Sequence, residues 1–193
     1  MIGLNSTIMK PILFSILLLF TGSAILSCIQ VYGLTNDYGK LSDEQKTLIS
    51  PLENFENLEN GKIYTLNSNQ LKDELKNHEK AIVYVFTNGC TSDYCLPMNV
   101  YISYAEANDY QLFLVMDGYG QLNKTLDQDA EVPYFAIDNE FYGVTNRTKY
   151  SNYFENELMN LPKETKHKEY PGSLFFFENG EIKNVYRELP KVE

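Results

Sequence analysis

Tryptophan is absent from this chain of 193 residues, and cysteine (3 residues) and histidine (2 residues) are scarce. Three cysteines are too few to hold a small fold together by disulfides. Two histidines without a His-x-x-His pattern argue against a structural zinc site. Basic residues are also the minority, with 16 Lys and Arg against 26 Asp and Glu and a net charge of −10. Because phosphate binding requires clustered positive charge, the composition argues against nucleic acid as a partner.

The remaining composition is that of a folded protein. Hydrophobic residues make up 44% of the chain and aromatic residues 13%. This excludes wholesale disorder, and the length predicts one domain with an appended segment.

Residues 1–27 have the pattern of a secretory signal peptide. Lys10 is the only charged side chain in a weakly basic start, an apolar run follows over 11–26, and the small residue Ser27 ends it. The run is shorter than the roughly 20 residues that a membrane-spanning helix needs. An uncleaved membrane anchor is the alternative interpretation.

The end of this segment, Ile25-Leu26-Ser27-Cys28, resembles a bacterial lipobox. The resemblance implies that Cys28 is lipidated and becomes the new N-terminus, so that a lipid anchor holds the domain at a membrane surface outside the cytoplasm. It also favours the outer membrane, because Ile29 is not the aspartate that retains such proteins at the inner membrane. The alternative is a free cysteine at position 28.

After the signal, we predict a tether with a short helical segment over 28–60 and a folded domain over 61–193. Ser42 and Gln45 form a capping-box pattern, which predicts a helix over about 42–49. In the domain, the apolar run 81–86 predicts a central strand, since both of its faces are apolar. Asn179-Gly180 between two strand-like runs predicts a hairpin. The remaining predicted elements are strands at 63–66, 111–116 and 132–137 and helices at 69–79, 94–107 and 147–161. This order predicts an α/β fold, with a central mixed β-sheet and helices on both faces.

Cys90 and Cys95 follow the predicted central strand, and outside the cytosol such a close pair can be oxidised. A disulfide needs Cα atoms about 4.4–6.8 Å apart, whereas five positions along a regular helix rise about 7.5 Å. We therefore expect Cys90 in a loop and Cys95 in the first turn of the helix, with Ser92 or Asp93 as its N-cap. A helix N-terminus stabilises a thiolate, whereas the carboxylate of Asp93 opposes it.

The order of elements over 61–187, with a cysteine after the second strand and a proline before the closing hairpin, resembles the thioredoxin fold. The best match is the segment Tyr170–Ile182, similar to the family's proline, strand, Asn-Gly, strand closure. The chain departs from the family in three ways: four residues separate the cysteines instead of two, Gly89 replaces an aromatic residue, and Tyr84 replaces a buried acid. The long segment 118–160 is similar to the peroxiredoxin-like branch and to the membrane-tethered extracytoplasmic branch, the TlpA/ResA type.

The resemblance implies thiol–disulfide exchange on the cysteines of exported proteins. Cys90 would attack a partner disulfide, Cys95 would resolve the mixed disulfide, and Pro171 would adopt the cis form and shape the substrate groove. The implied partners are protein thiols and disulfides, together with a membrane electron donor if the protein is a reductase. No cofactor and no resident metal are implied.

Two other functions fit the same residues. The first is a non-catalytic binding lipoprotein in which the disulfide between Cys90 and Cys95 is structural. The second resembles the Sco-type copper chaperones, with His167 as a third ligand, because Cu(I) prefers thiolates and accepts imidazole. Those proteins have three residues between the cysteines, whereas this chain has four.

Overall fold

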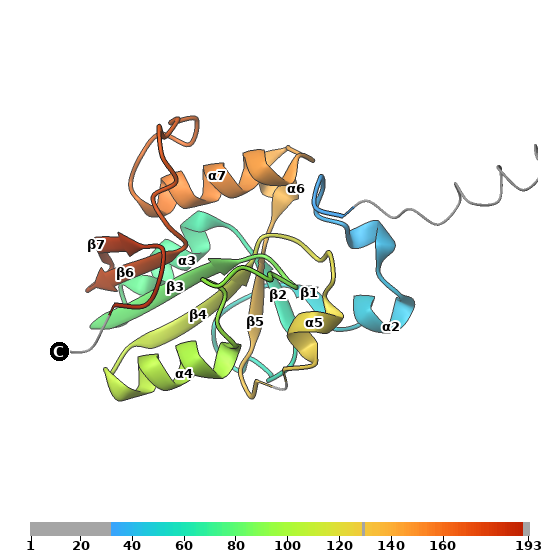
Figure 1. The fold of residues 1–193 in the computed structure, drawn as a ribbon, viewed down its shortest axis with the longest axis horizontal. Helices are drawn as coiled ribbons and strands as arrows, with labels where there is room; N and C mark the ends of the chain where they lie inside the picture. Colours follow the sequence, from blue (N-terminus) through green and yellow to red (C-terminus); the bar gives the residue numbers. More distant parts are fainter. Residues whose placement is uncertain (1–31, 129, 191–193) are drawn as a thin grey trace, which may run out of the picture. The chain divides into compact units, whose positions relative to one another are not determined.

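A computed structural model describes residues 32–128 and 130–190 of the chain (Figure 1). The predicted signal segment and Cys28 lie outside these ranges. In chain order the elements are η2 (Tyr38–Lys40), α2 (Asp43–Lys46), β1 (Ile49–Pro51), β2 (Ile63–Leu66), α3 (Ser68–Leu75), β3 (Lys80–Phe86), α4 (Met98–Ala107), β4 (Gln111–Met116), α5 (Asn123–Leu126), β5 (Tyr134–Ile137), α6 (Asn139–Tyr142), α7 (Arg147–Leu158), β6 (Leu174–Glu178) and β7 (Glu181–Tyr186). None of the helices in the described ranges is long and apolar enough to cross a bilayer.

The strands of the described chain form one seven-stranded mixed sheet in the order β1-β2-β5-β4-β3-β6-β7. The five neighbouring strands β1, β2, β5, β4 and β3 run parallel to one another. By contrast, β6 runs antiparallel to β3, and β7 runs antiparallel to β6. Residues 81–86 of β3 are all buried, as expected for a strand that is apolar on both faces. The predicted α/β class with a central mixed sheet is thus confirmed.

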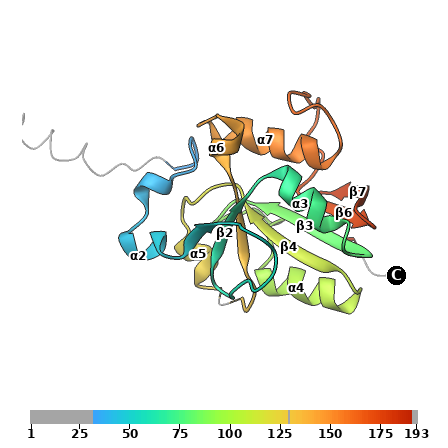
Figure 2. The same ribbon diagram turned by 180° about the vertical axis from the view of Figure 1, so that it is seen from behind.

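Helices cover both faces of the sheet, which makes three layers (Figures 1 and 2). On one face, α3 and α7 pack against the strands, and the core residues they contribute include Leu71, Leu75, Tyr150, Phe154 and Leu158. On the other face lies α4, with Met98, Tyr101 and Ala105 as its buried residues. Each fully buried aliphatic or aromatic side chain contributes about 1.5–3 kcal/mol, so these two cores hold the helices on the sheet.

The closing hairpin forms where the sequence predicts it. Asn179 and Gly180 both have positive φ, 50° and 77°, which the tight turn between antiparallel strands requires. The pairing of β6 with β3 sets the position of the chain that precedes β6, because Leu174 pairs with Tyr84.

The segment expected to be a tether contributes an additional strand. The helix predicted over 42–49 is only α2, and Ile49 then pairs in parallel with Ile63 of β2. A three-residue strand at a sheet edge leaves no periodic pattern in the sequence, and Pro51 is tolerated because an edge strand pairs on one side only.

Candidate redox site

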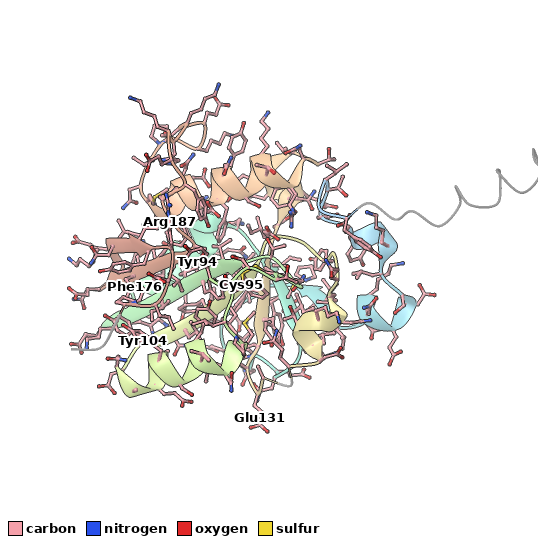
Figure 3. The ribbon with its side chains drawn as sticks, viewed as in Figure 1. Tyr94, Cys95, Tyr104, Glu131, Phe176 and Arg187 are labelled. Atoms are coloured by element: carbon pink, nitrogen blue, oxygen red, sulfur yellow. A yellow bond between two sulfur atoms is a disulfide. The ribbon has the colours of Figure 1, made fainter. Side chains whose placement is uncertain are left out.

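The two cysteines lie on the loop of residues 87–97, here called the cysteine loop, which runs from the carboxyl end of β3 to α4. Cys90 and Cys95 form a disulfide with their Cα atoms 6.0 Å apart. This separation lies within the range that a disulfide allows. Figure 3 labels Tyr94 and Cys95 on this loop and Tyr104 on the helix that follows it.

The prediction that Cys95 occupies the first turn of a helix is wrong. The helix begins at Met98, and Pro97 takes the N-cap position without a side-chain bond, so neither Ser92 nor Asp93 caps it. Proline disfavours helical backbone at the residue before it, which keeps residue 96 and the chain before it out of the helix. Instead, the N–H of Cys95 donates to the carbonyl of Ser92 at 2.9 Å, and this turn brings the cysteines together. Both cysteines therefore lie outside the first turn of α4, the part of the helix where its field is strongest.

The two cysteines differ in exposure, and the disulfide lies between two cavities. Cys90 is exposed, whereas Cys95 is half-buried. On one side is a cavity of about 510 Å³ whose walls include Tyr170, Ser173 and Arg187. On the other side is a cavity of about 440 Å³ toward α5, and both cysteines line both cavities. The disulfide is therefore bordered by a cavity on each of two sides.

The antiparallel pairing of β6 with β3 brings residues 170–173 beside the cysteine loop. The N–H of Val85 donates to the carbonyl of Ser173 at 2.9 Å. Gly172 has φ 140°, and a Cβ there would overlap the carbonyl of Tyr186. Tyr170, with 52% of its surface exposed, lines the 510 Å³ cavity.

Pro171 does not have the geometry that the resemblance implies. The described residues contain no cis peptide bond, so the bond before Pro171 is trans, the form that X–Pro bonds prefer by about 0.5–1 kcal/mol. The carbonyl of Tyr170 in this peptide accepts a hydrogen bond from Nε of Arg187 at 3.0 Å. Pro171 lines a neighbouring cavity of about 350 Å³ and not the cavities beside the disulfide.

Buried polar groups anchor the start of the cysteine loop. Asn88, 2% exposed, donates to the carbonyl of Gly118 at 2.7 Å and accepts from the hydroxyl of Thr125 at 2.6 Å. The hydroxyl of Thr87 donates to Asp117 at 2.7 Å. These bonds tie the end of β3 to the chain that follows β4.

Asp117 is a mostly buried carboxylate with one basic partner. Nη1 of Arg147 lies 3.1 Å from its Oδ1. Burial raises the pKa of Asp117 above its usual value, and the charge of Arg147 opposes this rise. The same arginine donates to the carbonyl of Gly33 at 3.0 Å, so the network also holds the N-terminal end of the described chain.

Glu155 on α7 is a second buried carboxyl group behind this region. It is 8% exposed and lines the 350 Å³ cavity with Pro171. Burial raises the pKa of Glu155 to about 8, and the charge of Asp117 adds to the rise. At neutral pH its carboxyl group therefore holds a proton in the folded protein.

His167, the third ligand of the copper hypothesis, lines the 350 Å³ cavity together with Glu155. It lines neither cavity beside the disulfide. Its Nε2 is 2.6 Å from Oδ1 of Asn156. In the described part of the chain, no three His, Cys, Asp or Glu side chains are grouped so that they could hold a metal ion.

Several side chains that shape the site were not predicted. For Asn88 the sequence holds one signal, a polar residue two positions after the end of a buried strand. Oε1 of Gln128 accepts a hydrogen bond from the N–H of Met98 at 2.8 Å and so caps α4. The sequence holds no signal for this bond, because it joins positions 30 residues apart. Glu155 left none either, since it lies within a buried stripe of α7.

No protein-family model, no curated protein and no solved structure was found to match this chain.

Proposed function

We propose that the protein is an extracytoplasmic thiol–disulfide oxidoreductase of thioredoxin-like fold, anchored to a membrane through Cys28. The observation that carries the proposal is the setting of the disulfide: Cys90 is exposed, Cys95 is half-buried, and cavities lie on both sides of the pair. A disulfide that exchanges with a partner needs one sulfur accessible to attack.

A purely structural role explains this setting less well. The disulfide joins residues five positions apart on one loop. Because the stabilisation from a disulfide grows with the length of chain it closes, so short a loop gains little, about 2 kcal/mol in the chain-entropy model. It also fastens no helix or strand to another, whereas a stabilising disulfide usually joins separate parts of a fold.

In the proposed reaction the reduced protein reacts with a disulfide of an exported protein. The thiolate of Cys90 attacks one partner sulfur, and the other partner sulfur leaves as a thiolate. The thiolate of Cys95 then attacks the sulfur of Cys90, which releases the second partner thiolate and forms the Cys90–Cys95 disulfide. Two electrons pass from the protein to the partner, and the reverse sequence oxidises a partner dithiol. Turnover as a reductase requires a dithiol donor at the membrane.

In this proposal the partner chain binds in the 510 Å³ cavity. Tyr170 and Ser173 form the wall opposite the cysteine loop, and Pro171 limits the backbone freedom between them. The signal-like start of the chain and the lipobox-like residues before Cys28 support a location outside the cytoplasm, where disulfides persist.

The test is capture of the mixed disulfide with the purified full chain. Cys95→Ser should accumulate a covalent complex with a disulfide-containing model protein, because the resolving thiol is missing. Cys90→Ser should form none. Cys28→Ser is the matched control, since it removes the third cysteine and should leave exchange unchanged. If Cys95→Ser forms no complex, or the native disulfide resists mild reductant until the protein unfolds, the proposed exchange activity is refuted and a structural disulfide is favoured.

A further inference from the structure

Tyr101 on α4 is bonded to the backbone on both sides of Cys95. The N–H of Leu96 donates to its hydroxyl oxygen at 3.3 Å, and its hydroxyl lies 3.4 Å from the carbonyl oxygen of Tyr94. The first group belongs to the peptide unit after Cys95 and the second to the peptide unit before it. A single buried hydroxyl, on a side chain 2% exposed, thus contacts both peptide units of this cysteine.

Tyr84 on β3 completes the bonding of that hydroxyl. The two hydroxyl oxygens are 3.2 Å apart, and the two rings are stacked with their centroids 4.1 Å apart. A tyrosine hydroxyl has one proton to donate and two lone pairs to accept with. All three bonds are therefore satisfied when Tyr101 donates to Tyr94 and accepts from both Leu96 and Tyr84. The hydroxyl of Tyr84 holds its proton at neutral pH, as a tyrosine with its ordinary pKa of about 10 does, and burial raises that pKa further.

We propose that Tyr101 is a positioning residue that holds Cys95 within reach of Cys90, and thereby favours the disulfide over the dithiol. Its bonds go to backbone groups and not to the sulfur, so they can persist when the disulfide is reduced. Holding two thiols close together raises their effective concentration, which shifts the equilibrium toward the disulfide. This inference rests on the proposed function, because it concerns the equilibrium of the same cysteine pair.

The test is the equilibrium constant of the pair with glutathione, measured on the full chain by thiol alkylation and mass. Tyr101→Phe keeps the stacked ring and removes both bonds to the cysteine loop. It should shift the constant about tenfold toward the dithiol, which corresponds to about 30 mV. The matched control is Tyr104→Phe on the same helix, whose ring packs on Phe176 and lines neither cavity beside the disulfide. It should change the constant less than about twofold.

A merely structural role for Tyr101 gives a different result. It would lower the unfolding temperatures of the oxidised and reduced proteins equally and leave the equilibrium constant unchanged, which would overturn the proposal. If Tyr101→Phe does not fold, Tyr84→Phe takes its place. It removes one donor to Tyr101 and should shift the constant about threefold in the same direction, and an unchanged constant would again overturn the proposal.

The outcome also separates this inference from the proposed function. The constant is measured against glutathione alone, without a protein partner. Exchange activity with no shift in Tyr101→Phe would refute only the role of Tyr101. Failure of Cys95→Ser to trap a partner would refute the function, whereas the comparison of Tyr101→Phe with Tyr104→Phe would stand.

Discussion

Replacing Glu155 by glutamine should remove a loss of folding stability that grows as the pH rises. The carboxyl group is 8% exposed, and its pKa in the folded protein is about 8, against 4.5 for an unperturbed group. Between pH 4.5 and about pH 8 the folded state holds a proton that the unfolded state has lost. The stability of the wild-type protein therefore falls as the pH rises through this window, by at most about 1.4 kcal/mol per pH unit from this group.

The magnitude is large enough to measure. Summed over the window, the penalty is on the order of 5 kcal/mol, comparable with the 5–15 kcal/mol by which most domains are stable. Glutamine has nearly the same shape and no charge at any pH. The free energy of unfolding of Glu155→Gln, relative to wild type, should therefore rise steadily from pH 5 to pH 8.

Urea unfolding of both proteins at pH 5, 6, 7 and 8, with the disulfide intact, gives this difference. Glu164→Gln is the matched control, because that side chain is exposed and its difference from wild type should stay flat across the series. If the difference for Glu155→Gln is equally flat, the carboxyl group is ionised in the folded protein at neutral pH and the reasoning from burial is wrong.

Two further substitutions test the backbone around the disulfide. Gly172→Ala should cost about 2–4 kcal/mol in urea unfolding, because its Cβ would overlap the carbonyl of Tyr186. The control Gly143→Ala, at φ 63° with no atom within 4 Å of the added Cβ, should cost about 1 kcal/mol, and equal losses would contradict the account. Asn88→Ala should cost about 1–3 kcal/mol, since it leaves the buried carbonyl of Gly118 and hydroxyl of Thr125 without this partner. It should also speed reduction of the disulfide by dithiothreitol, and an unchanged rate would show that Asn88 does not hold the cysteine loop.

The parts of the fold that the sequence predicts well are those that leave local patterns. The run 81–86 is apolar on both faces and becomes the buried strand β3. Asn179-Gly180 supplies the positive φ of the hairpin turn. By contrast, β1 is three residues long and exists through its pairing with β2, which is not encoded in its own sequence.

In the candidate site, too, local patterns are predictable from the sequence, whereas contacts between distant positions are not. Cys90 and Cys95 are evident from their spacing, but the start of α4 is set by Pro97 and by Gln128 from another part of the chain. The helix predicted over 94–107 therefore begins later, and Leu96 lies before it and is 39% exposed. Nothing in the sequence position of Tyr101 shows that its hydroxyl reaches back to the cysteine loop.

The measurement that tests the central claim most directly is the reduction potential of the Cys90–Cys95 pair in the folded protein. Equilibration in glutathione or dithiothreitol buffers, followed by alkylation and mass analysis, gives its value. An exchange enzyme should have a potential between about −120 and −270 mV, and the position within that range indicates whether it oxidises or reduces its partners. A potential below about −300 mV, or a disulfide that reacts only when the protein unfolds, would contradict the account and identify the disulfide as structural.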